Sequence, residues 1–142
     1  MLIRPMTVDD AQEVAALSGQ LGYPATESQV LDSFQAISAK PDNAFFVADN
    51  GGVVGWLQVL GVHFLASLAP FAEIGGLVVD AAFRRQGVGR ALMAQAEEWA
   101  KAQGYAEVRL RSGLHRTDAH QFYERIGYTL AKTNHMFCKD VG

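Results

Sequence analysis

The chain has 142 residues, of which 49% are hydrophobic and 19% are charged, a composition typical of a single globular domain. The net charge of −3 argues against a nucleic-acid partner, and no run of about 18 uncharged apolar residues predicts a membrane span. One cysteine, Cys138, cannot form an internal disulfide, and no secretory pattern opens the chain, so a cytoplasmic protein is expected.

In the first half of the chain, turn and capping residues separate short periodic segments. Thr26 followed by Gln29 is a capping box, which predicts the start of a helix. Asn50, Gly51 and Gly52 suit a hairpin turn between two strands. The predicted elements are a strand at 2–6, a helix with Val14, Leu17 and Leu21 on one face, a helix after Thr26, and strands at 44–48 and 53–62.

The second half contains the strongest helical pattern of the chain, over residues 86–103. Its apolar residues recur every three to four positions, and Gly104 is suited to end the helix. The other predicted elements are a loop at 67–70, a strand at 71–79, a strand at 105–111, a helix at 118–126, and strands at 128–131 and 136–139. The order of the predicted strands and helices therefore indicates one mixed α/β domain over residues 1–142.

A loop rich in arginine and glycine lies between the strand at 71–79 and the strong helix. The start of a helix leaves N–H groups without partners and carries partial positive charge, so it attracts phosphate. Glycine lets phosphate approach the backbone closely, and arginine adds charge-assisted contacts. A tight turn that needs glycine only for its conformation remains an alternative. The candidate residues are Arg84, Arg85, Gln86, Gly87, Val88, Gly89 and Arg90.

Two motifs of the chain resemble the GNAT superfamily of acetyl-CoA-dependent N-acetyltransferases. Arg84-X-X-Gly87-X-Gly89 follows an apolar strand, as the acetyl-CoA motif of that superfamily does, and residues 118–128 are similar to its A-x-x-F-Y-x-x-x-G-F/Y helix. The resemblance covers residues 72–128. The same part of the chain is also similar to bacterial aminoalkylphosphonate N-acetyltransferases. It implies the GNAT acyl-CoA N-acyltransferase fold, with a splayed central sheet flanked by helices, and acetyl-CoA as cosubstrate.

The resemblance also implies how the strand at 71–79 would serve the cosubstrate. The pantetheine arm of CoA would lie along Leu77, Val78 and Val79, and the amides of 85–90 would hold the pyrophosphate. Gly75 and Gly76 stand where the superfamily has a β-bulge, and glycine inside a strand independently signals a bulge. The amide of Leu77 would then polarise the thioester carbonyl.

Tyr123 and Glu73 are the candidate catalytic residues. Tyr123 matches the superfamily tyrosine that protonates the departing thiolate, although its position on an apolar helix face also suits a tyrosine that only packs. Glu73 would accept the proton of the attacking amine, and strand alternation places it on the side of Gly75 and Leu77. An edge carboxylate in an ion pair is the alternative for Glu73.

The acceptor and the remaining polar residues are less constrained. The expected acceptor is a primary amine of a small molecule; a protein lysine or N-terminus, and a non-catalytic acyl-CoA sensor, are alternatives. No metal-ligand spacing is present, and ordinary surface or capping roles suit the four histidines. A homodimer is a further expectation, since the predicted C-terminal strands are apolar. The histidines are His63, His115, His120 and His135.

Overall fold

The computed structural model describes residues 1–20, 22–66, 69–114 and 116–142, which form two compact units, Met1–Arg111 and Ser112–Gly142. The predicted apolar residue Leu21, the first residues of the predicted loop at 67–70, and His115 lie outside the described residues. The elements of the first unit are β1 (Leu2–Pro5), a short 3-10 turn (Val8–Asp10), α1 (Ala11–Gln20), α2 (Glu27–Ser38), β2 (Asn43–Asp49), β3 (Val53–Val62), β4 (Phe71–Val79), a second 3-10 turn (Ala81–Phe83), α3 (Val88–Ala102) and β5 (Val108–Arg109).

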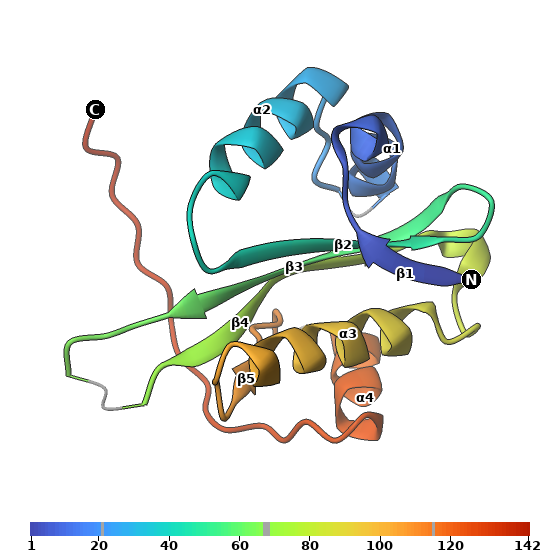
Figure 1. Ribbon diagram of the computed structural model, residues 1–142. Coiled ribbons are helices and arrows are strands. Elements are labelled where there is room, and N and C mark those ends of the chain that lie inside the picture. Colours follow the sequence, from blue (N-terminus) through green and yellow to red (C-terminus); the bar gives the residue numbers. More distant parts are fainter. Residues whose placement is uncertain (21, 67–68, 115) are drawn as a thin grey trace. The chain divides into compact units, whose positions relative to one another are not determined.

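The first unit is built on one sheet that, in the described residues, has five strands in the order β1-β2-β3-β4-β5. Neighbouring strands are antiparallel except β4 and β5, which are parallel. Helices α1 and α2 cover one face of the sheet and α3 covers the other (Figure 1). This arrangement confirms the predicted mixed α/β fold, and the predicted bounds of β3 and β4 are those observed.

Alternating side chains on the central strands fill two cores, one on each face of the sheet. Leu57 and Val59 of β3 are fully buried, as are Leu92 and Met93 of α3. On the other face, Val78 of β4 packs in a cluster with residues of α1 and β2, and Trp56 lies against that cluster. Because β3 is apolar on both faces, it forms the central strand between the two layers of helices.

The predicted bulge in β4 is present at Gly75. The register pairs Gln58 with Gly76 but the next residue of β3, Val59, with Ile74, so Gly75 is the extra residue. A Cβ atom at Gly75 would lie 2.9 Å from Gln58 Oε1, and one at Gly76 would lie 2.8 Å from Trp56 Cη2. Both glycines are therefore needed to let two large β3 side chains lie against β4.

The bulge corrects the predicted orientation of one residue. Glu73, Gly75 and Gly76 all face the side of β3 that carries Gln58, whereas Leu77 is paired with Leu57 on the α3 side. The prediction that Glu73 and Leu77 share a side was therefore wrong, because the extra residue reverses the alternation after Gly75.

The second unit contains α4 (Thr117–Arg125) as its helix, close to the prediction. The two strands predicted at 128–131 and 136–139 are absent from the described residues, where Leu130, Met136 and Phe137 are exposed. An apolar run becomes a strand only when a neighbouring edge pairs with it, and these residues have none. The strand predicted at 105–111 is shortened to β5.

No helix in the described part of the chain has the length and apolar character needed to cross a membrane.

Candidate active site

The edge of β4 is unpaired after its first residues. β5 pairs with β4 only at Ala72 and Glu73, so in the described residues the stretch 74–79 has β3 on one side and no strand on the other. The amide of Asp80 donates to the carbonyl of Val54 on β3 at 2.9 Å. Alternation then directs the N–H groups of Leu77 and Val79 toward the unpaired edge, where an extended ligand can pair with them.

The loop that follows β4 gathers amides that lack partners. Gly87, the N-cap of α3, has φ 82°, and Arg85 has φ 63°, both in the left-handed region. The backbone amides of residues 86–90 donate no hydrogen bond to any described residue. Left-handed residues that alternate with others turn successive amides toward one concavity, which favours an anion. The helix dipole of α3 adds partial positive charge at the same point.

Three exposed arginines surround these amides. Among the described residues, no ion pair involves Arg84, Arg85 or Arg90. Guanidinium groups without an acidic partner are available for an anionic ligand. The donor set of this loop therefore fits the pyrophosphate of CoA, with the side chains around the backbone amides.

Glu73 lies in an ion pair. Its Oε1 is 3.2 Å from Nε of Arg111, and the Glu73 side chain is 24% exposed while that of Arg111 is 73% exposed. Glu73 therefore forms the ion pair that was expected as the alternative to a catalytic role. Because the Arg111 side chain is so exposed, water competes with this pair and the pair is weak. Nearby, Arg109 donates to Glu107 and lies 3.9 Å from the centroid of the Phe71 ring.

Tyr123 belongs to the second unit, on α4. Its ring is in edge contact with Phe122, 5.2 Å between centroids, and with Tyr128, 6.2 Å between centroids. Burial raises the pKa of the Tyr123 phenol, while the positive charge of Arg116 opposes that shift. The phenol is therefore protonated at neutral pH, as a proton donor must be.

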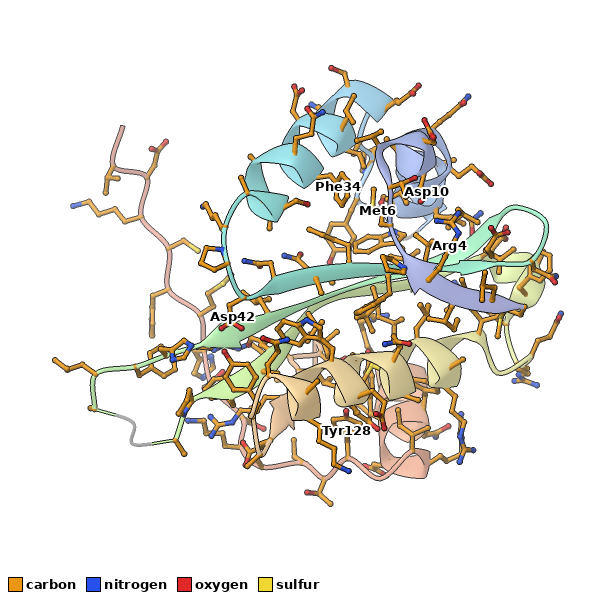
Figure 2. All side chains as sticks on the ribbon, viewed as in Figure 1. Arg4, Met6, Asp10, Phe34, Asp42 and Tyr128 are labelled. Carbon is orange, nitrogen blue, oxygen red and sulfur yellow. The ribbon has the colours of Figure 1, made fainter. Side chains whose placement is uncertain are left out.

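A cavity of about 220 Å³ lies between the helices α1 and α2 and the sheet. Phe34, Phe45 and Trp56 supply aromatic walls, and Gln58, which packs against Gly75, also lines the cavity. Figure 2 shows Met6 and Phe34, two of the lining residues, between the helices and the sheet. The sequence analysis did not predict this cavity. Gly75 and Gly76 were the one local sign of it, because adjacent glycines in a strand mark a place where large side chains approach the backbone.

A cluster of Asp42, His63 and Tyr105 was also missed. The hydroxyl of Tyr105 donates to Asp42, and Nε2 of His63 lies 3.2 Å from Asp42 Oδ2 and 3.1 Å from the Tyr105 oxygen. The loss of hydration and the neighbouring carboxylate raise the pKa of Tyr105 to about 12. The three residues are more than 20 positions apart in the chain, so no local sequence pattern predicts that their side chains meet. No group of three potential metal ligands is found in the described ranges.

The Asp42–Tyr105 contact predicts an alkaline loss of stability. The folded phenol keeps its proton to about pH 12 whereas an unfolded phenol loses it near pH 10, so the contribution is complete below pH 10 and disappears as the pH rises to about 12. Thermal unfolding of the wild type and of Tyr105→Phe, followed from pH 8 to pH 12 in steps of ~1 unit, should show the difference in Tm shrinking above pH 10. A constant difference would contradict this account.

Comparisons with known proteins agree with this geometry. The family model described as acetyltransferase (GNAT) family matches residues 10–128. An aminoalkylphosphonate N-acetyltransferase of Salmonella typhimurium is 34% identical over 128 residues, which cover 89% of this chain and 83% of that protein. A solved structure from Agrobacterium tumefaciens, proposed to be an acetyltransferase, has 28% identity and a TM-score of 0.86, covering 98% and 100% of the two chains. An aminoglycoside N-acetyltransferase crystallised with CoA shares the fold, with a TM-score of 0.86 at 20% identity over 97% of this chain and 93% of its own.

Proposed function

Because the chain belongs to the acetyltransferase (GNAT) family and is an enzyme that uses acetyl-CoA, we propose that it moves the acetyl group to a primary amine of a small molecule by direct attack. Acetyl-CoA supplies the acetyl group as a thioester. The amine nitrogen attacks the thioester carbonyl, the C–S bond breaks, and the sulfur takes up a proton. No covalent enzyme intermediate is required, and Cys138 is exposed in the C-terminal segment.

One observation carries this proposal: in the described part of the chain, the edge of β4 beyond Glu73 pairs with no strand and leads directly into a loop of free backbone amides. The pantetheine arm would lie along Leu77 and Val78 and pair with the amide of Val79, and the amides of Arg85, Gln86 and the first turn of α3 would hold the pyrophosphate. Leu77, the second residue after the bulge, would donate to the thioester oxygen. An extended, anionic ligand requires both a strand edge that it can pair with and a loop whose backbone amides can donate to its phosphates.

The test is release of free CoA thiol with a panel of primary amines. We expect turnover that depends on both acetyl-CoA and an amine, and acetylation of the amine seen by mass spectrometry. Saturable binding of acetyl-CoA without turnover of any amine or of a lysine-containing peptide would contradict the enzymatic proposal and would favour a non-catalytic sensor. Turnover of the peptide alone would favour a protein acetyltransferase.

Glu73 is proposed as the base that deprotonates the amine. Replacing it with glutamine should lower kcat/KM by about a hundredfold, the usual size for a general base. The loss should be greatest at low pH, where more of the amine carries the proton that must be removed. The measurement is the pH profile of kcat/KM for the variant and the wild type.

Two control variants separate the base from a structural ion pair. Glu107→Gln removes another carboxylate that pairs with an arginine, Arg109, and should leave the profile unchanged. Arg111→Gln removes the partner of Glu73 and should retain most of the activity. If Arg111→Gln reproduces the loss seen with Glu73→Gln, the glutamate serves only the ion pair.

The organisation and location of the chain are further proposals. The family match spans both compact units, which supports one functional domain over residues 1–142. Homodimerisation is proposed from the apolar C-terminal segment, in which Leu130, Met136 and Phe137 are exposed. Analytical ultracentrifugation tests the dimer, and fractionation of cells tests the cytoplasmic location.

A further inference from the structure

The cavity between α1, α2 and the sheet has a wall without charge. Its described lining consists of apolar and aromatic side chains with a few neutral polar residues, and no acidic or basic residue contributes to it. Two of the polar groups already have partners: Ser18 donates to the carbonyl of Val14 at 2.9 Å, and Oε1 of Gln29 accepts from the amide of Thr26 at 2.9 Å. The wall therefore offers little to a ligand with several charges.

The cavity also adjoins the strand proposed to hold the thioester. Trp56 and Gln58 belong both to its lining and to the packing against the bulge glycines, so these two side chains connect the cavity with β4. Glu73 faces the same side of the sheet, two residues before Gly75. A neutral wall matches a ligand with an uncharged body, whose single amino group is the one that the proposed transfer requires.

The volume of the cavity is large enough for a compact body. An engineered apolar cavity of about 150 Å³ binds benzene, and the cavity in this chain measures about 220 Å³. One aromatic ring with a short side chain therefore fits. A phosphonate would need a cation in the wall, and no described residue of the lining carries one.

We propose, resting on the proposed acetyl transfer, that the acceptor is a monoamine with a compact uncharged body, an arylalkylamine in particular, seated in this cavity. The aromatic walls of Phe34, Phe45 and Trp56 hold the ring, and the amine reaches toward β4 past Gln58. Phe34 and Phe45 are themselves in edge contact, 5.3 Å between centroids, which gives the wall a fixed shape.

The first test compares kcat/KM for phenylethylamine, aminoethylphosphonate, spermidine and kanamycin. The arylalkylamine should exceed each of the others at least about tenfold, because burial of an extra charge without a partner is costly. A higher kcat/KM for aminoethylphosphonate or kanamycin overturns the inference while acetyl transfer stands.

A matched pair of variants tests the cavity itself. Val30→Arg places a cation in the wall and should lower kcat/KM for phenylethylamine by about tenfold or more. Gln35→Arg adds the same charge to an exposed position of the same helix, away from the cavity, and should leave it unchanged. Equal effects of the two variants overturn the assignment of the cavity as the acceptor site.

A binding measurement separates this inference from the proposed catalysis. The chain has two tryptophans, so Trp99→Phe leaves Trp56, in the cavity wall, as the single tryptophan, whose fluorescence can be excited selectively over that of tyrosine. Phenylethylamine without acetyl-CoA should change this fluorescence saturably, and aminoethylphosphonate should not. Saturable binding without thiol release from any amine would reject the proposed function alone; the absence of binding would reject the cavity assignment, whatever the activity.

Discussion

Replacement of Tyr123 by phenylalanine is expected to lower kcat by about a hundredfold or more, the usual contribution of a general acid. The variant keeps the ring and its edge contacts with Phe122 and Tyr128, so α4 should fold as before. It loses only the hydroxyl that is proposed to protonate the departing thiolate. KM for acetyl-CoA should change little, since that proton is delivered only as the C–S bond breaks.

The pH dependence of this variant is the sharper measurement. Burial raises the pKa of Tyr123 above 10, so the wild-type phenol remains a proton donor across the neutral and mildly alkaline range. The loss in Tyr123→Phe should therefore be constant over that range. Tyr128→Phe, a change of the same size in the same unit, is the control and should retain activity. An unchanged kcat in Tyr123→Phe at saturating amine would show that Tyr123 is a packing residue.

Most of the first unit was predictable because its signals are local. The capping box of Thr26 and Gln29 is formed by two hydrogen bonds, at 2.9 and 3.1 Å, between residues three positions apart. Gly51, with φ 82°, lies in the hairpin where positive φ was expected. Caps and turns of this kind depend on the chain within a few residues, so the sequence alone specifies them.

The missed features depend on pairing between distant residues. Leu130 and Met136 lie in short apolar runs, yet whether such a run becomes a strand is decided by a partner edge, and none is provided by the described residues. The orientation of Glu73 relative to Leu77 depends on the bulge position, which only the register with β3 specifies. The β4 edge and the loop at Arg84 were predictable as candidates because glycine and arginine mark them locally, whereas the cavity arises from two helices and two strands packed together.

An unpredicted ion pair between Arg4 and Asp10 ties β1 to the turn that follows it. Nη1 and Nη2 of Arg4, which lies near Asp10 in Figure 2, each donate to an oxygen of Asp10 at 2.8 Å. The amide of Thr7 donates to the same carboxylate at 2.8 Å. The Asp10 side chain is 6% exposed. These contacts, the bond from Arg4 above all, hold the pKa of Asp10 below its usual value. Asp49 is a second, more exposed partner of Arg4, at 3.2 Å.

Arg4→Met should therefore lower the free energy of unfolding at pH 7 by about 3 kcal/mol, because a buried carboxylate loses its cation. The contribution of the pair is present above the unfolded pKa of 3.8 and is lost as the pH falls through the lower folded value. Urea unfolding of both proteins should thus show a difference that is full at neutral pH and shrinks in acid. Asp49→Asn, which removes the exposed partner and leaves Asp10 paired, should cost less than about 1 kcal/mol. If the two variants are equally destabilised, or if the deficit of Arg4→Met is independent of pH, the buried Asp10 carboxylate is not what the arginine stabilises.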